Sequence, residues 1–154
     1  MGETDTPVMR DGATPGESVC VTGRIGRSAG GFRLFETDPE RANELFRFEP
    51  RVAAGRAVAP HASAMMDSSD GVARSLHQLG EASDCGFAVE YDRFPVHESV
   101  ETVATDGTDA RELAVHFGED FELVFTTDDP EHVREVSPVP VSVIGEVIEA
   151  GVEM

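Results

Sequence analysis

Residues 18–32 read SVCVTGRIGRSAGGF, and this stretch contains a complete unit of structure. Its opening segment, Ser18–Thr22, is short, rich in valine and bounded by glycines, which is typical of a buried strand followed by a turn. The glycine-rich run from Gly23 to Gly31 then leads into a helix that is expected to include Leu34 and Phe35. The stretch therefore predicts a strand, a glycine-rich loop and a helix in succession.

On the C-terminal side of this unit, strand-like and helix-like patterns mix without strict alternation. Helices are expected where a capping or turn-forming residue precedes an apolar stripe, and strands where apolar residues alternate. The expected helices run from Asp38 to Pro50, from Gly71, from Ala110 to Gly118 and from Pro130, and the expected strands cover residues 62–66, 87–91, 121–125 and 141–147. Several neighbouring strands have connections too short for a helix, so we predict a mixed sheet with helices packed on it.

The composition favours a folded, acidic protein. The chain has 154 residues, 40% of them hydrophobic, which suits one domain; its net charge is −18, and every basic residue is arginine. An acidic surface repels itself in dilute buffer, but at 1 M salt the Debye length shrinks to about 3 Å. We therefore interpret the charge as halophilic adaptation. The alternative, an acidic tail or a disordered activator, is opposed by the apolar residues interspersed among the acids along the whole chain. Nucleic acid is not an expected partner, because phosphate backbones are bound by basic patches.

The sequence gives no reason to expect a targeting signal. No apolar run reaches the length of a membrane span, and the acidic N-terminus lacks the order of a signal peptide. We therefore expect a soluble cytoplasmic protein with no membrane partner. Cys20 and Cys85 have no CxxC spacing and are expected to be buried free thiols. Residues 1–9 are expected to form a disordered lead-in to a domain that spans 10–154.

The first candidate for chemistry is Asp67-Ser68-Ser69-Asp70-Gly71, where an apolar strand gives way to a helix. Two carboxylates three positions apart at such a junction can point at one spot, and Mg²⁺ prefers oxygen ligands. The serine between them can cap the helix or donate to a phosphate. The alternative is an ordinary turn with a helix cap, and the spacing alone leaves both interpretations open.

Two further segments carry candidate functional residues. The glycines of residues 23–31 allow backbone N–H groups to approach a phosphate, or they serve tight turning and close packing; the spacing matches neither the Walker nor the dinucleotide pattern. At Gly118–Glu122, Glu119 and Asp120 precede a strand and are candidates for contacts with a substrate, whereas Glu122 is interpreted as facing solvent. His77 has no ligand-like partner in the sequence and is interpreted as structural.

Four segments, taken together and in order, resemble the C-terminal half of thiamine-monophosphate kinases in a haloarchaeal-like version. They are RDGATPGE at residues 10–17, VTGRIGRSAGG at 21–31, MDSSDG at 66–71 and GEDFEL at 118–123. The resemblance extends to about Val147. These kinases share a superfamily with the aminoimidazole ribonucleotide synthetases, and the resemblance to their C-terminal domain implies an α+β fold, a three-layer sandwich of mixed β-sheet with flanking helices.

The resemblance implies a kinase that transfers the γ-phosphoryl group of ATP to thiamine monophosphate, with the help of Mg²⁺. By matching motifs, it implies that Asp67 and Asp70 hold Mg²⁺ and that Arg10 and Ser69 contact ATP. It also implies that Glu119 contacts thiamine monophosphate. Carboxylate-held magnesium and an arginine are suited to this work, because phosphoryl transfer depends on positioning and charge neutralisation.

In this family an aspartate-rich N-terminal half precedes the matching segment, and nothing like it occurs in this sequence. The resemblance therefore implies that the chain alone is incomplete for activity and acts as a homodimer or together with the missing half. Two alternatives remain open: a relative with another phosphoryl acceptor, and a non-catalytic nucleotide-binding or assembly module. The joint presence of Asp67, Ser69, Asp70 and Glu119 favours catalytic use.

Overall fold

The computed structural model describes residues 6–149 and 152–153. Most of the expected lead-in, residues 1–5, lies outside the described part of the chain. Within residues 6–149, none of the helices combines the length and apolarity that a membrane span requires.

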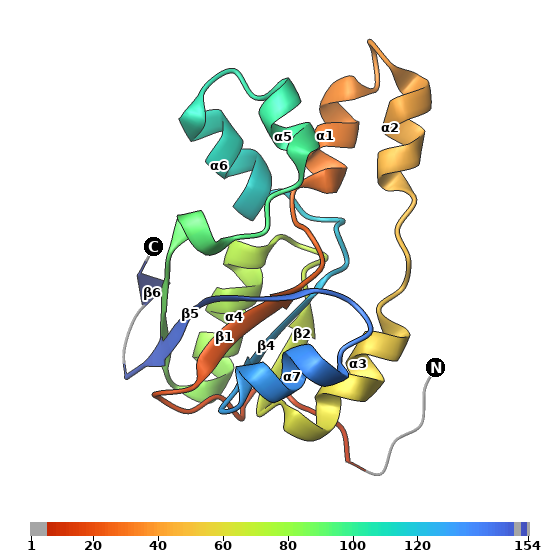
Figure 1. Cartoon of the computed structure of the whole chain (residues 1–154). Coiled ribbons are helices and arrows are strands. Elements are labelled where there is room, and N and C mark those ends of the chain that lie inside the picture. Colours follow the sequence, from red (N-terminus) through yellow and green to blue (C-terminus); the bar gives the residue numbers. More distant parts are fainter. Residues whose placement is uncertain (1–5, 150–151, 154) are drawn as a thin grey trace.

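Six strands form one sheet in the order β2-β4-β1-β5-β3-β6 (Figure 1). They are β1 (Ser18–Thr22), β2 (Ala64–Asp67), β3 (Gly86–Val89), β4 (Leu123–Thr127), β5 (Val141–Ile148) and β6 (Val152–Glu153). Neighbouring strands pair antiparallel, except that β3 and β6 pair parallel. The sheet is therefore mixed, as predicted.

Seven α-helices and two 3-10 turns accompany the sheet in the described residues. The helices are α1 (Arg27–Leu34), α2 (Pro39–Phe46), α3 (Val52–Val58), α4 (Val72–Ser83), α5 (Glu98–Val103), α6 (Gly107–Val115) and α7 (Pro130–Val136), and the 3-10 turns are η1 (Ala59–His61) and η2 (Tyr91–Arg93). The cap of α2 follows its sequence signal, because the Asp38 carboxylate accepts from the backbone N–H of Arg41 and Pro39 is the first helical residue.

Alternation along the strands distributes the core over both faces of the sheet. Val19 of β1 packs with Leu76 of α4 on one face, whereas its neighbour Cys20 packs with Val58 of α3 and Val133 of α7 on the other. The sheet therefore lies between α4 and the pair α3 and α7, which confirms the three-layer α+β sandwich.

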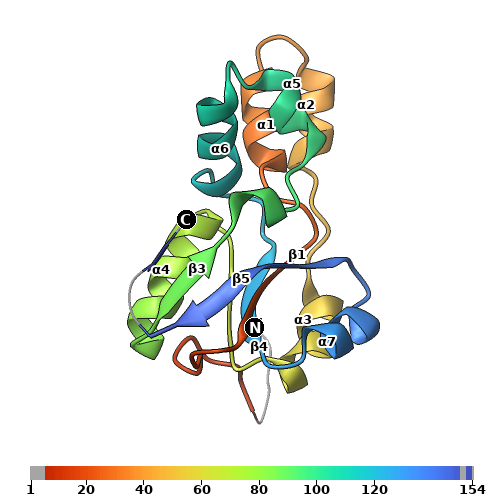
Figure 2. The same cartoon turned by 60° about the vertical axis from the view of Figure 1, so that its left-hand side comes forward.

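The remaining helices form a group at one end of the sheet (Figures 1 and 2). Ala29 of α1, Val100 of α5 and Leu113 of α6 share a separate apolar cluster, and Gly31 of α1 lies against Phe46 of α2. This group follows directly after β1, to which residues 23–26 connect it. The glycine-rich run was expected to be a loop as far as Gly31, but α1 begins at Arg27, so its second half is helical.

Several boundaries differ from those predicted. Phe121 was expected to begin a strand, but its φ of 53° breaks the extended pattern and β4 begins at Leu123. Tyr91 lies in η2, beyond the end of β3. The sequence patterns also missed α5, which has too few apolar residues for a clear stripe, and the short β6 after the expected last strand. His77 is exposed on α4 and lies outside the core.

Candidate functional site

Three sequence motifs meet at one edge of the sheet. β1 ends at Thr22 and β2 ends at Asp67, while β4, antiparallel to both, begins at Leu123 beside Asp67. Because antiparallel strands place the end of one beside the start of the next, the glycine-rich loop, the Asp67–Gly71 loop and the Gly118–Glu122 loop all leave this edge. Segments far apart in sequence therefore form one surface.

Backbone hydrogen bonds lock the two acidic loops together. The N–H of Glu119 donates to the carbonyl of Ser69 at 2.8 Å, and the N–H of Ser68 donates to the carbonyl of Glu122 at 2.8 Å. In return, the N–H of Glu122 donates to the Ser68 hydroxyl at 3.0 Å. A side chain at Gly118 would collide with the Ser69 carbonyl, so the close approach of these loops requires glycine there.

The structure brings Asp67 and Ser69 together and leaves Asp70 beside them at the start of α4. The Ser69 hydroxyl donates to the Asp67 carboxylate at 3.1 Å, and both side chains remain accessible to solvent. Asp70 is 66% exposed and lies 3.5 Å from the guanidinium of Arg74, one turn along α4. Gly71, with φ of 93°, makes the turn between these loop residues and the helix.

The donor set suits a hard divalent cation that also binds a ligand. In the described ranges 6–149 and 152–153, no group of three or more His, Cys, Asp or Glu side chains is arranged as a complete metal cage. Mg²⁺ does not require one, because it is commonly held by one or two carboxylates together with water and substrate phosphates. Asp67 and Asp70, with the Ser69 hydroxyl nearby, are the residues here that could hold it in this way.

Arg10 and Asp67 line the same open groove. The groove has a volume of about 690 Å³ and is lined by Val8, Met9, Arg10, Asp11, Met65, Met66, Asp67, Ala82 and Leu123. The Arg10 guanidinium donates to Gln78 of α4 at 3.4 Å, and the Arg10 carbonyl accepts from the Ser83 hydroxyl at 2.9 Å. The structure therefore holds the predicted arginine on the same groove as the predicted metal-binding carboxylate.

A side chain of this protein occupies the backbone N–H groups of the glycine-rich loop. The Asp120 carboxylate, 4% exposed, accepts from the backbone N–H groups of Gly26 and Ser28 at the start of α1. Burial raises the pKa of the Asp120 carboxyl, and these two hydrogen bonds oppose that shift. Because these N–H groups already have an anionic partner, the structure favours packing over phosphate binding for this loop. Gly30 supports the same interpretation, since a side chain there would overlap the Ser99 hydroxyl.

Glu119 is the exposed member of its motif. Its carbonyl accepts from the Ser28 hydroxyl at 2.7 Å, and its φ of 69° lies in the left-handed region. Asp120, between Glu119 and the equally left-handed Phe121, faces inward to α1. Strained backbone of this kind concentrates at functional sites, which makes Glu119 a candidate for ligand contact.

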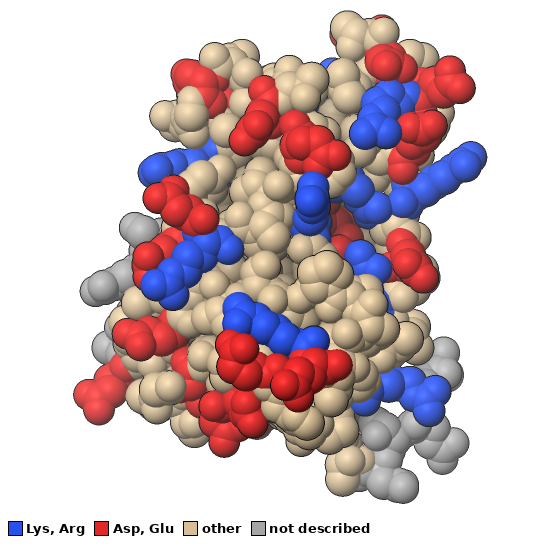
Figure 3. Space-filling view, in the orientation of Figure 1, with Lys and Arg blue, Asp and Glu red and all other residues tan. Residues whose placement is uncertain are grey.

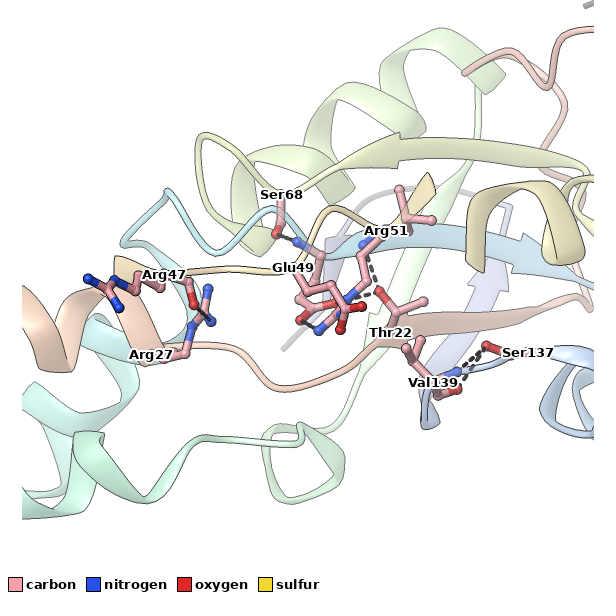
Figure 4. Close-up of polar contacts among 10 residues, drawn as sticks. Thr22, Arg27, Arg47, Glu49, Arg51, Ser68, Ser137 and Val139 are labelled. Atoms are coloured by element: carbon pink, nitrogen blue, oxygen red, sulfur yellow. Dashed lines mark hydrogen bonds and ion pairs between the residues drawn. The ribbon is translucent and has the colours of Figure 1, made fainter. Parts of the chain in front are cut away.

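Glu122 does not face solvent, so that prediction was wrong. Its carboxylate accepts from the Thr22 hydroxyl at 2.7 Å and from both the Nε and Nη2 groups of Arg51 at 2.8 Å. These hydrogen bonds, with electrostatic support from Glu122 and Glu49, raise the pKa of Arg51, although burial opposes the shift. Sequence reasoning missed Arg51 because it lies 71 residues away from its partner. Figure 4 shows Thr22, Arg51 and Ser68, which all contact Glu122.

Residues 14–153 match the family described as AIR synthase related protein, C-terminal domain. The chain belongs to this family. Membership agrees with the three-layer α+β sandwich. The matched range covers the two acidic loops and the glycine-rich loop, and Arg10 lies just outside it.

Several proteins that this chain resembles are thiamine-monophosphate kinases. A thiamine-monophosphate kinase of Halobacterium salinarum is 53% identical over 97% of this chain and 52% of its own length. A crystal structure of thiamine-monophosphate kinase from Stenotrophomonas maltophilia gives a TM-score of 0.84 at 27% identity, covering 95% of this chain and 52% of that one. A structure of AaThiL complexed with AMPPCP and TMP gives a TM-score of 0.73 at 28% identity, covering 94% and 49%. The chain spans about half the length of the relatives that it matches.

Proposed function

We propose that the chain is the C-terminal half of a thiamine-monophosphate kinase and supplies part of its ATP and Mg²⁺ site. The observation that carries the proposal is the 53% identity to a kinase of this name over nearly the whole chain. The solved relative that binds AMPPCP and TMP supports ATP and thiamine monophosphate as the two substrates. The meeting of three motifs at one sheet edge adds independent support.

In the proposed site, Asp67 and Asp70 hold Mg²⁺, Arg10 and Ser69 contact ATP, and Glu119 contacts thiamine monophosphate. Bound Mg²⁺ neutralises phosphate charge and helps to orient the transferred group. The chain's own contribution is positional. The Ser69 hydroxyl donates to the Asp67 carboxylate at 3.1 Å in this structure, and it would turn its O–H to a phosphate oxygen once that carboxylate holds Mg²⁺. Arg10 lines the adjoining groove. This agrees with phosphoryl transfer, in which catalysis consists mainly of positioning and electrostatic stabilisation.

The reaction so assigned moves the γ-phosphoryl group of ATP onto the phosphate of thiamine monophosphate, giving thiamine diphosphate and ADP. This chain supplies few of the carboxylates that several Mg²⁺ ions would need. We therefore propose that it works as a homodimer or with a polypeptide equivalent to the other half of its relatives. The second component would contribute the remaining metal ligands.

The working environment proposed for the protein is a salt-rich cytoplasm. Acidic side chains are spread over the visible face among arginines (Figure 3), and the net charge is −18. Self-repulsion of such a surface decreases as salt shortens the Debye length. The relative from Halobacterium salinarum supports the same proposal.

The test is calorimetry of ATP binding in molar KCl, with and without Mg²⁺. It compares the wild-type chain with the double variant Asp67→Asn and Asp70→Asn, and with the control Asp128→Asn, an exposed acid outside the site. Magnesium-dependent binding that is lost only in the double variant supports the proposal. Binding that is independent of Mg²⁺ and equal in all three proteins would indicate a nucleotide-binding module without the kinase site. No binding by folded wild-type protein would overturn the proposal that this half alone provides an ATP and Mg²⁺ site.

A further inference from the structure

A largely buried ion pair adjoins the loops of the proposed site. Arg51 contacts Glu122 through two N–H groups, each 2.8 Å from a different carboxylate oxygen. The two side chains are 17% and 5% exposed. Arg51 precedes α3, whereas Glu122 precedes β4, so the pair joins the α2 to α3 connection to the sheet edge.

The same glutamate connects all three loops of the site. Its carboxylate accepts from Thr22 at the end of β1, and the Thr22 hydroxyl accepts in turn from the N–H of Leu123 at 2.9 Å. Its backbone exchanges two hydrogen bonds with Ser68, which is 1% exposed and lies between Asp67 and Ser69. A shift of Glu122 would therefore displace the residues proposed to bind metal and nucleotide.

The stability of the fold does not by itself explain this ion pair. Replacing a buried ion pair by apolar side chains of similar volume is often neutral or stabilising, because desolvation offsets the electrostatic attraction. A guanidinium and a carboxylate joined by two parallel hydrogen bonds do, however, fix each other's orientation closely. The useful property of Arg51 and Glu122 is therefore geometric.

We infer that Arg51 and Glu122 are positioning residues that hold Ser68, and through it Asp67 and Ser69, in the geometry required for magnesium and nucleotide. The inference rests on the proposed function, because it concerns the same site. Neither side chain needs to touch the ligand. Their role resembles that of outer-shell partners of metal ligands, whose loss typically weakens metal affinity by roughly 10–100-fold.

The experiment replaces the ion pair by uncharged side chains, so that an effect on the geometry of the site can be distinguished from an effect on the stability of the fold. The variant Arg51→Met with Glu122→Met keeps similar side-chain volume and removes the paired hydrogen bonds. Its control is Arg134→Met with Glu131→Met, which removes the exposed 2.6 Å ion pair on α7. Glu122→Gln is measured beside them in case the first variant does not fold. Each protein is tested in molar KCl for its melting temperature, its hydrogen exchange at residues 66–71, and its affinity for ATP with Mg²⁺.

The inference predicts faster exchange at residues 66–71 and an affinity about tenfold lower or more in the folded variants, whatever the change in melting temperature. The Arg134 and Glu131 control keeps wild-type affinity and exchange. Unchanged affinity and exchange in the folded charge-free variant, while the wild type binds, would overturn the positioning role but leave the proposed function intact. Failure of the folded wild-type chain itself to bind ATP with Mg²⁺ would overturn both the ATP and Mg²⁺ site proposed for this half and the positioning role.

Discussion

The carboxylate of Asp120 accepts a hydrogen bond of 2.9 Å from the backbone N–H of Ser28, at the first turn of α1. The N–H of Gly26 donates to the other oxygen of the same carboxylate. A helix N-terminus attracts anions through its free N–H groups and its dipole. Here the loop that presents Glu119 supplies that anion, so the packing of α1 and the position of Glu119 depend on one side chain.

Replacing this anion by a methyl group should destabilise the fold. In Asp120→Ala the buried N–H groups of Gly26 and Ser28 lose their partner, and we expect the free energy of unfolding to fall by about 1–3 kcal/mol. The control Asp106→Ala removes the exposed cap of α6 and should cost about 0.5–1 kcal/mol. Chemical denaturation measures both values. A loss at Asp120 no larger than that at Asp106 would contradict the buried-anchor interpretation.

The same carboxyl should give a distinctive pH dependence. Burial raises its pKa above the ordinary value of 3.8, so just above that pH the folded chain retains a proton that the unfolded chain has released. The contribution of Asp120 to stability is therefore largest below 3.8 and is lost as pH rises through the raised pKa. Unfolding free energies of wild type and Asp120→Asn, measured from acid upward, should show the wild-type advantage shrinking. A wild-type advantage that grows with pH would mean that the hydrogen bonds from Gly26 and Ser28 affect the pKa of Asp120 more than burial does.

Two helical glycines should respond in opposite directions to alanine. A methyl group at Gly30 of α1 would overlap the Ser99 hydroxyl, so Gly30→Ala should lower the free energy of unfolding by about 1–3 kcal/mol. At Gly55 of α3 the nearest atom lies at an ordinary contact distance of 3.5 Å from the added carbon, so helix propensity dominates and Gly55→Ala should stabilise by about 0.5–1 kcal/mol. Thermal or denaturant unfolding of the two variants makes the comparison. Loss of stability at both positions would show that the space around Gly55 is tighter than its geometry indicates.

Local patterns were sufficient for most of the fold. The run at Ser18–Thr22, bounded by glycines, predicts β1, and Asp38 before Pro39 predicts the start of α2, because both signals depend on neighbouring residues alone. The pattern after Gly71 predicts α4 in the same way. The prediction at Phe121 failed because alternating apolar residues suggest an extended chain, whereas Asp120 must turn inward to reach α1.

The buried contacts of the site could not be predicted from local sequence patterns, because their partners lie far apart along the chain. An acid at the start of a strand is usually exposed, and only the arrival of Arg51 from the α2 to α3 connection makes burial of Glu122 favourable. The glycine-rich loop presented the same difficulty, because Asp120, which fills the N-terminus of α1, lies about 90 residues along the chain. Grouping of the motifs was predictable only through the family resemblance.

His97 should make the fold less stable in mild acid. Burial lowers its pKa below the ordinary 6.5, and nearby Arg24 adds to this, although Glu98 opposes it. Its Nδ1 accepts from the backbone N–H of Ser99 at the start of α5, a contact that a neutral ring makes. As pH falls below 6.5 the unfolded chain binds the proton first, so this contribution to stability is present above 6.5 and is lost toward the folded pKa. NMR titration of the ring should give a midpoint below 6.5, and His97→Gln should reduce the pH dependence of the free energy of unfolding. A midpoint above 6.5 would mean that His97 stabilises the fold in acid instead.

The two cysteines should differ sharply in reactivity although both are free thiols. Cys20 is fully buried in β1, and burial raises its pKa to about 12, so roughly one thiol in ten thousand is ionised at pH 8. Cys85 is half-buried rather than buried as expected, and burial raises its pKa as well. A disulfide reagent should therefore modify one thiol per folded chain, and none in Cys85→Ser, whereas denaturant should expose both in the wild type. Modification of Cys20 in folded Cys85→Ser, at a rate faster than global unfolding, would show that the layer formed by α3 and α7 opens locally over the sheet.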